Sequence, residues 1–191
     1  IPIISEIEFA SSYSNSFKIC ITGTNGKTTT TKLIHHILNK SGLDVGLAGN
    51  IGDSFSKMLL SGDKDIYVIE ISSFQLDDIK KFKPNISIIT NIIEDHLDRY
   101  ENDFSKYVDA KMKIIKNQDE SDYLIYNSDD KALMEVLKNK KLVLNDYSIW
   151  GLLLKHAPIS VGKGTIAIMP QYAFQDHILK QLLKKLYYAF K

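Results

Sequence analysis

The chain has 191 residues, of which 44% are hydrophobic and 25% are charged. These values are typical of an ordinary globular domain and exclude disordered, collagen-like and coiled-coil classes. With 24 basic and 23 acidic residues the formal charge is +1, so there is no basic excess to suit a nucleic acid. The single cysteine, Cys20, excludes an intrachain disulfide and favours a reducing, cytoplasmic compartment. No apolar run reaches the roughly 18–20 residues that span a bilayer, so no membrane association is expected.

Strands and helices are expected to alternate along the first three quarters of the chain. Short apolar runs predict buried strands, and apolar residues at helical spacing predict the helices between them. This alternation predicts an α/β fold with a mostly parallel sheet and helices on both faces. The expected strands are 17–22, 44–50, 66–72, 86–91, 122–127 and 141–145, and the expected helices are 28–40, 54–60, 75–82, 104–115 and 131–138.

This alternation stops after Asn145. We therefore expect residues 17–145 to form the α/β domain, with residues 1–16 leading into it and residues 146–191 of unassigned role. The last part holds a possible strand at 165–169 and ends in an amphipathic helix at 174–190. The apolar stripe of that helix suits packing against protein better than a membrane surface.

The sharpest motif is the loop TGTNGKTTT, residues 22–30, between an expected strand and an expected helix. Backbone N–H groups in a glycine turn, followed by a helix N-terminus, bind anions such as phosphate. Lys27 would add a point charge, and Thr28 would offer a hydroxyl to Mg²⁺. The spacing is G-x-x-G-K-T, shorter than the common P-loop, because Ile21 stands where that motif has glycine. The alternative is a plain strand–helix turn with a solvated lysine.

Two further polar groups lie at or after the ends of strands. Glu70 is the one charged residue in the apolar segment 66–72, where a carboxylate is costly unless it is paired or bound to a metal. His96 lies in the polar cluster NIIEDHLDRY, residues 91–100, after the next strand. Because open parallel sheets bind ligands at the carboxyl ends of their strands, both side chains should meet Lys27 there. The alternatives are a structural ion pair for Glu70 and a capped, charged loop for His96.

Five segments in this order resemble the Mur ligase family: TGTNGKTTT, AGNIG at 48–52, EISSFQLD at 70–77, NIIEDHLDRY, and AKMKII at 110–115. The resemblance covers roughly residues 2–130 and corresponds to the central, ATP-binding domain of these enzymes, which has a P-loop NTPase-like fold. Within the family, SSFQL after the strand acid resembles the branch that adds D-glutamate to UDP-N-acetylmuramoyl-L-alanine. The family's other two domains hold the uridine nucleotide and close over ATP and the amino acid, and neither is expected in this chain.

The resemblance implies an ATP-dependent amide ligase of peptidoglycan precursor synthesis, acting in the cytoplasm with ATP and Mg²⁺. Its partners would be UDP-N-acetylmuramoyl-L-alanine and D-glutamate, and this chain would be the central-domain fragment. Two alternatives stay open. One is a nucleotide-binding module without turnover, and the other is a Mur-like ligase with a different acceptor amino acid.

The resemblance also implies a role for each matching residue. Lys27, Glu70, His96 and Lys111 would be catalytic. The metal would be held by Thr28, Glu70, His96 and Lys111, the last as a carbamate, because anionic oxygens bind Mg²⁺ whereas an ammonium repels it. Without the other motifs, Lys111 would read as a solvated helix lysine. The nucleotide-binding residues would be Gly23, Thr24, Asn25, Gly26, Lys27, Thr28, Thr29 and Asn91, and the substrate-binding residues would be Asn50, Ser72 and Ser73.

Overall fold

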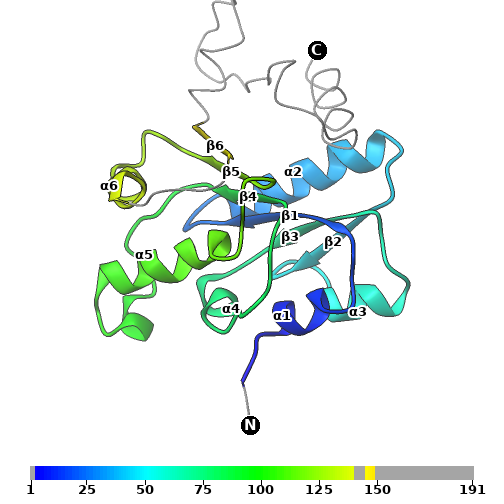
Figure 1. Ribbon diagram of the computed structural model, residues 1–191, viewed down its shortest axis with the longest axis horizontal. Coiled ribbons are helices and arrows are strands. Elements are labelled where there is room, and N and C mark those ends of the chain that lie inside the picture. The colour runs from blue at the N-terminus through cyan, green and yellow to red at the C-terminus, as the bar shows by residue number, and fades with distance from the viewer. Residues whose placement is uncertain (1–2, 140–144, 149–191) are drawn as a thin grey trace, which may run out of the picture.

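The computed structural model describes residues 3–139 and 145–148, which form a sheet covered by helices (Figure 1). The strands are β1 (Phe17–Thr22), β2 (Val45–Gly49), β3 (Ile66–Glu70), β4 (Ile86–Ile89), β5 (Tyr123–Tyr126) and β6 (Asn145–Ser148). The helices are α1 (Glu6–Ser11), α2 (Lys27–Lys40), α3 (Phe55–Leu60), α4 (Ser73–Asp77), α5 (Phe104–Met112) and α6 (Lys131–Asn139), with 3₁₀ turns η1 (Leu97–Tyr100) and η2 (Lys113–Ile115).

The strands pair in the order β2-β3-β1-β4-β5-β6, and every pair is parallel. β1 lies in the middle of the sheet, where Ile21 pairs with Glu70 on one side and with Ile88 on the other. The carboxyl ends of β1, β3 and β4 therefore lie next to one another. The three loops that carry the polar motifs leave the sheet at this edge, and the predicted α/β fold is confirmed.

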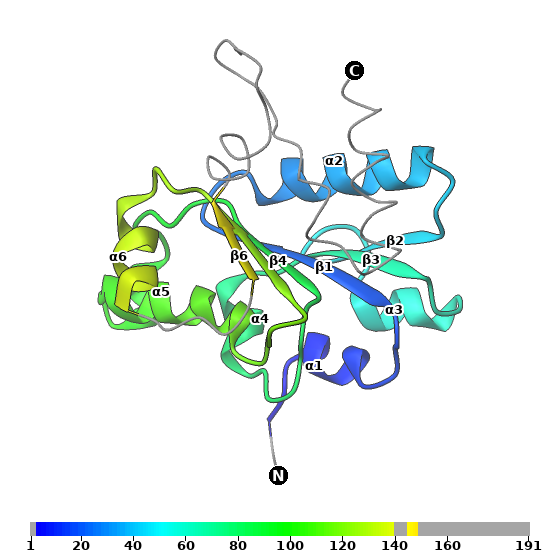
Figure 2. The same cartoon turned by 45° about the horizontal axis from the view of Figure 1, so that its top comes forward.

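Helices cover both faces of the sheet, with α2 on one face and α1, α3, α4 and α5 on the other (Figure 2). Strand side chains alternate between faces, so each strand contributes to both layers. In β1, Ile19 and Ile21 pack under α2 with Leu38, whereas Cys20 belongs to the larger core on the opposite face. Leu133 of α6 joins this second core. Burial on both faces explains why the strands read as continuous apolar runs.

One helix lies earlier in the chain than expected. The sequence predicts a helix over 75–82, but α4 occupies Ser73–Asp77 because Ser72 and Gln75 form a capping box at its start. The backbone N–H groups of Lys80, Lys81 and Phe82 donate to the Glu8 carboxylate instead of continuing the helix. Glu8 lies on α1, a helix that the sequence patterns did not indicate, so a contact distant in sequence decides where α4 ends.

The last described strand also differs from the expected range. β6 begins at Asn145 and ends at Ser148, so it shares one residue with the expected strand 141–145. The sheet consequently extends past the domain boundary expected at 145. Residues 141–144, the possible strand at 165–169 and the expected helix at 174–190 lie outside the described residues.

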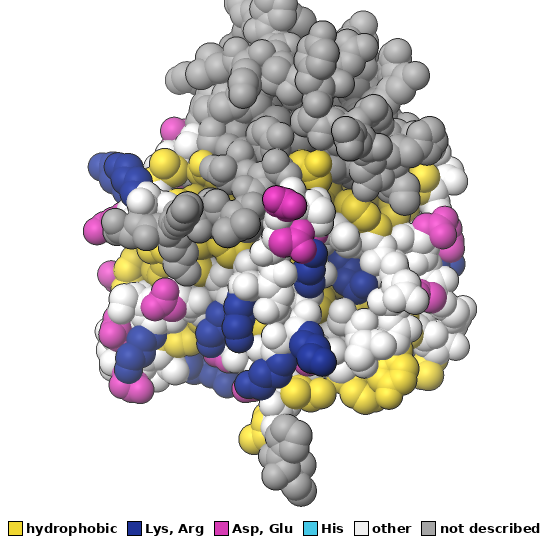
Figure 3. Space-filling view, in the orientation of Figure 1, with side chains coloured by type: hydrophobic (Ala, Val, Ile, Leu, Met, Phe, Trp, Pro, Cys, Tyr) yellow, Lys and Arg dark blue, Asp and Glu magenta, His cyan; other side chains and the backbone are white. Residues whose placement is uncertain are grey.

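The face of the molecule that Figure 3 shows carries both positive and negative side chains. In Figure 3, lysine and arginine side chains lie among acidic ones, and apolar side chains line the lower edge near α1 and α3. Phe9 on α1, Tyr13 just after it and Leu60 on α3 are exposed apolar residues. Within the described residues, none of the helices has both the length and the apolar character to cross a bilayer.

Candidate nucleotide-binding site

The phosphate loop joins β1 to α2. Gly26 is the N-cap of α2, with φ of 80°, and no side chain caps the helix. A glycine adopts this left-handed conformation without steric cost. The first N–H groups of a helix have no carbonyl partner one turn earlier, so the start of this 14-residue helix presents free donors. Backbone donors at the positive end of a helix dipole suit a phosphate group.

The Lys27 ammonium lies against the loop. Its Nζ donates to the carbonyl oxygens of Gly23 at 2.9 Å and Thr24 at 2.8 Å. Both partners are neutral, so the positive charge is not cancelled by an ion pair. The lysine can exchange these weak acceptors for phosphate oxygens, since charge-assisted hydrogen bonds are the stronger ones.

The segment after β4 holds the phosphate loop in shape. The Thr24 N–H donates to the Asn91 carbonyl at 2.8 Å. The Asn91 side chain accepts from the Asn25 N–H at 2.9 Å and donates to the Asn25 carbonyl at 3.1 Å. Thr90 Oγ1 also donates to the Asn25 carbonyl, at 2.7 Å. The side chain of Asn91 thus supports the loop backbone, so its part in nucleotide binding would be indirect.

Glu70 ends β3 directly beside this loop. It is 2% exposed, and it accepts hydrogen bonds from Thr28 Oγ1 at 2.8 Å and from Asn50 Nδ2 at 3.1 Å. Among the described residues no lysine or arginine pairs with it, so the ion-pair alternative finds no support there. A buried carboxylate with only neutral partners favours a bound cation. Together with the Thr28 hydroxyl it supplies the oxygen ligands that Mg²⁺ prefers beside a phosphate.

Lys111 is buried next to the same loop. Its side chain is among the largest fully buried ones, and Nζ donates to the Gly23 carbonyl at 2.8 Å. Burial, and after it the positive charge of Lys27, lower the pKa of Lys111 to about 7, while Asp95 opposes both. A solvated helix lysine is therefore the wrong interpretation. Half of such amines are neutral near pH 7, and the neutral amine is the nucleophilic form.

One side chain that the sequence motifs did not single out, Tyr107, completes the support of the loop. The Lys111 ammonium lies 4.5 Å from the centre of the Tyr107 ring, and the Tyr107 hydroxyl is 3.1 Å from Thr24 Oγ1. Thr24 Oγ1 also accepts from the Ile93 N–H at 3.0 Å. A signal for Tyr107 existed, because it precedes Lys111 by four residues and so shares its helix face.

The remaining expected residues are less closely joined to the loop. His96 is exposed, and its ring contacts Phe74, with centroids 5.6 Å apart, and Asp95 Oδ2 at 3.6 Å. Ser72 caps α4 and Ser73 is 3% exposed, so Ser73 presents little surface to a substrate. No group of three His, Cys, Asp or Glu side chains in the described residues could hold a metal by itself. The structure thus unites Lys27, Thr28, Glu70 and Lys111 and places His96 on an aromatic neighbour.

Sequence comparison matches most of this chain to one family of proteins. A family model for the Mur ligase middle domain matches residues 21–173. The UDP-N-acetylmuramoylalanine–D-glutamate ligase of Christiangramia forsetii is 51% identical over 138 residues, 72% of this chain and 31% of that protein. The enzyme of the same name from Porphyromonas gingivalis is 53% identical over 130 residues, 68% of this chain and 29% of that protein. The chain therefore spans about a third of the length of such relatives.

Solved structures share the fold at low sequence identity. MurF ligase from Thermotoga maritima, solved in complex with ADP, gives a TM-score of 0.58 at 19% identity and covers 74% of this chain and 34% of its own. FolC from E. coli, solved with DHPP and ADP, gives a TM-score of 0.55 at 16% identity and covers 76% of this chain and 47% of its own. At these identities the likeness establishes the architecture of the sheet and helices.

Proposed function

Because the chain belongs to the Mur ligase family through its middle domain, we propose that it is the ATP-binding unit of a ligase joining D-glutamate to UDP-N-acetylmuramoyl-L-alanine. Such a ligase works in the cytoplasm on peptidoglycan precursors. The ATP-binding domain is the sheet from residue 17 to the end of β6, with residues 1–16 leading into it. The observation that carries the proposal is the buried Glu70 carboxylate, without a cationic partner in the described residues, 2.8 Å from Thr28 at the phosphate loop.

The main obstacle to this reaction is the repulsion between the negative charges of its two substrates. The alanyl carboxylate of one substrate attacks the γ-phosphate of ATP, which gives an acyl phosphate and ADP, and the amine of D-glutamate then displaces phosphate to form the amide. A carboxylate approaches a polyphosphate only if both are neutralised. Lys27 and the amides at the start of α2 would bind the phosphate oxygens, and positioning and electrostatics dominate such a transfer.

Mg²⁺, when bound, neutralises phosphate charge and polarises the transferred group. Thr28 and Glu70 are the residues of this chain that would hold it, with His96 and a carbamylated Lys111 as further ligands. Asn50 would keep the Glu70 carboxylate oriented, since its Nδ2 donates to Oε1 and its N–H to the Glu70 carbonyl at 2.8 Å. A ligand oriented by a second hydrogen bond loses less entropy when the cation binds.

The lowered pKa of Lys111 predicts a pH-dependent carbamate. With a pKa of about 7, about a tenth of the amines are neutral at pH 6 and about nine tenths at pH 8. At a fixed pressure of ¹³CO₂, the carbamate carbon signal in the ¹³C spectrum should therefore grow from pH 6 to pH 8. Lys111→Arg should abolish it. Lys18→Arg should preserve it, because Lys18 is a second buried lysine whose Nζ donates to the Ser14 and Ser16 carbonyls on another part of the sheet. A signal that survives in Lys111→Arg would contradict the assignment.

We expect this chain alone to bind nucleotide without catalysing ligation. The chain alone should bind Mg-ATP, measured by calorimetry, because the loop, Thr28 and Glu70 are in place. It should not form product with ATP, UDP-N-acetylmuramoyl-L-alanine and D-glutamate, because the uridine-binding and closing domains of the family are needed for that. A longer protein containing this chain should release inorganic phosphate only when both substrates are supplied. Release that needs neither of them would favour the module without turnover, and release with another amino acid would favour a different acceptor.

A further inference from the structure

Arg99 is the only arginine in a chain that otherwise has 23 lysines among its 24 basic residues. Its guanidinium carbon lies 3.9 Å from the centre of the Phe74 ring. A planar guanidinium can lie flat on an aromatic face, whereas the round ammonium of lysine cannot stack in this way. At this position arginine can therefore stack on the Phe74 ring, which lysine could not do in the same way.

The same phenylalanine contacts the candidate metal ligand. The His96 ring meets the Phe74 ring at 64°, with centroids 5.6 Å apart, an arrangement typical of favourable edge contacts. Tyr100 stacks on Phe74 as well, at 6.3 Å and 18°. The Phe74 ring is thus surrounded by three side chains of the segment that contains η1, and we call Phe74, Arg99 and Tyr100 the aromatic platform.

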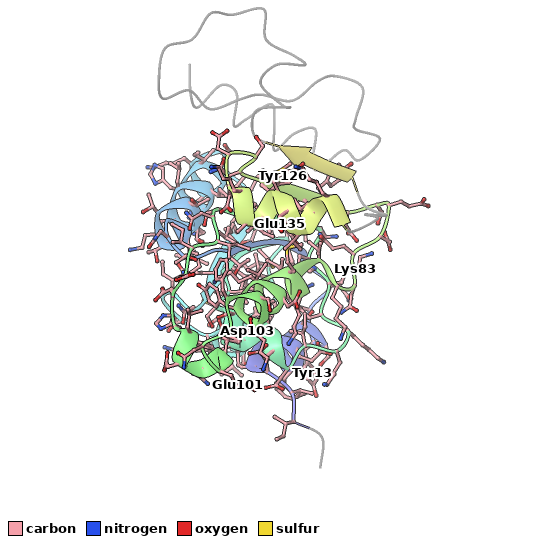
Figure 4. The ribbon with its side chains drawn as sticks, turned by 90° about the vertical axis from the view of Figure 1, so that its left-hand side faces the viewer. Tyr13, Lys83, Glu101, Asp103, Tyr126 and Glu135 are labelled. Atoms are coloured by element: carbon pink, nitrogen blue, oxygen red, sulfur yellow. The ribbon has the colours of Figure 1, made fainter. Side chains whose placement is uncertain are left out.

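The backbone around His96 needs such support. His96 has φ of 50° and Glu101, at the far end of η1, has φ of 56°, a left-handed conformation that costs a non-glycine residue energy. The Arg99 N–H donates to the His96 carbonyl at 3.2 Å, which closes the turn between them. Figure 4 shows Glu101 and Asp103 where this turn leads into α5. The turn brings the Arg99 and His96 side chains to one partner, Phe74.

The platform is anchored to the main body of the domain. The Tyr100 hydroxyl donates to Asp77 Oδ2 at 3.2 Å, and Lys113 Nζ lies 2.7 Å from Asp77 Oδ1. Asp77 ends α4, the helix that carries Phe74, so α4, η1 and the end of α5 are joined at a single carboxylate. The Phe74 ring consequently has a defined place relative to His96 before any ligand binds.

We propose that the aromatic platform, through Phe74 and Arg99, fixes the ring of His96 for its role beside the nucleotide-bound metal, which makes Phe74 and Arg99 positioning residues. This inference rests on the proposed function of His96 as a metal ligand. His96 is exposed, and among the described residues Asp95 is its one other side-chain partner in an ion pair or ring contact, so without the platform its ring would sample several rotamers. A site held about 1 Å too loosely loses much of its catalytic effect.

The first test needs no ligand. The His96 ring protons, identified by their loss in His96→Gln, are expected to carry a ring-current shift from Phe74 in the proton NMR spectrum. Phe74→Leu should remove this shift, and Arg99→Lys should reduce it although the charge is kept. Phe9→Leu is the matched control, because Phe9 of α1 packs on Tyr13, with ring centroids 5.1 Å apart, and should leave the His96 signals in place. Unchanged His96 shifts in both Phe74→Leu and Arg99→Lys would overturn the platform.

The second test asks whether the positioning matters. With Mn²⁺-ATP, the wild-type His96 ring protons should broaden because the ion is near. This broadening should fall in Phe74→Leu and Arg99→Lys when each protein is saturated with Mn²⁺-ATP at a concentration set by calorimetry. In a longer, active protein kcat should fall by about tenfold or more with KM for ATP near the wild-type value. If the wild type itself is not broadened, the metal role of His96 in the proposed function fails and the positioning role fails with it. If the wild type and both variants broaden equally, only the positioning role is wrong.

Discussion

Lys27→Ala is expected to weaken Mg-ATP binding strongly and to lower kcat of a ligating protein by about 10²–10³-fold, as for loss of one preorganised group that stabilises developing charge. Among the described residues the ammonium donates hydrogen bonds only to the Gly23 and Thr24 carbonyls, which it can exchange for phosphate oxygens. Because these contacts are to neutral, partly exposed groups, the free energy of unfolding should change by less than about 1 kcal/mol. Calorimetric titration with Mg-ATP and a denaturant curve measure the two quantities.

Lys32→Ala is the matched control for this prediction, because Lys32 is an exposed lysine on the same helix, one and a half turns further on. It should bind Mg-ATP like the wild type. Lys27→Ala should also raise the pKa of Lys111, because the charge of Lys27 is one cause of its low value, and the carbamate signal should then need a higher pH. Mg-ATP affinity that is equal in Lys27→Ala and Lys32→Ala would show that the phosphate-loop assignment is wrong.

Gly23→Ala is expected to destabilise the domain by about 3 kcal/mol through backbone strain and overpacking together. Gly23 has φ of 143°, and a Cβ there would lie 2.0 Å from Thr90 Oγ1 and 3.1 Å from the Asn91 carbonyl oxygen. Thr90 Oγ1 cannot move away freely, because it donates to the Asn25 carbonyl at 2.7 Å. The substitution should therefore push the phosphate loop away from the segment after β4 and abolish Mg-ATP binding. Urea unfolding and calorimetry measure the two effects.

Two variants separate strain from overpacking in this prediction. Gly42→Ala changes a glycine with φ of 78° that has nothing within 4 Å of the new Cβ, so it should cost only about 1 kcal/mol and leave Mg-ATP affinity unchanged. Adding Thr90→Ala to Gly23→Ala removes the 2.0 Å contact but keeps the tight approach to the Asn91 backbone. The double variant should be less destabilised than the sum of the two single changes. Equal stability of Gly23→Ala and Gly42→Ala would refute the close packing of the loop.

Most of the fold could be predicted from sequence because the central strands β1, β3 and β4 are buried on both faces. The runs at 17–22, 66–72 and 86–91 are apolar without alternation, which indicates a parallel sheet covered on both sides, and β1, β3 and β4 lie within these ranges. The helix α4, which lies at Ser73–Asp77 instead of the predicted 75–82, shows the limit of such predictions. Ser72 and Gln75, which cap the start of α4, are close in sequence, but the Glu8 carboxylate that takes the N–H groups after α4 lies over 70 residues away. Local patterns carry no information about such a partner.

In the candidate site, too, some features could be predicted from local sequence and others depend on contacts distant in sequence. The spacing of Gly23, Gly26 and Lys27 after a strand is a local property, so the sequence alone indicated a phosphate loop, and one acidic residue in an apolar strand indicated a special role for Glu70. Their meeting required the strand order, in which β1 lies between β3 and β4. That order places the Thr28 hydroxyl on the Glu70 carboxylate and puts Asn91 behind the loop.

What the sequence determined by itself is therefore the kind of most elements, α1 excepted, and the identity of the reactive groups, because both depend on neighbours within a few residues. Only the tertiary structure decided their chemical state. Lys111 reads as an ordinary helix lysine until the packing of α5 against the phosphate loop buries its amine, and that burial, with the charge of Lys27, lowers its pKa to about 7. The sequence patterns likewise gave Phe74 no role of its own, and only the fold brings His96 and Arg99 to its ring. Solvation and electrostatic environment are set by groups that are distant in the chain, and folding is what brings those groups together.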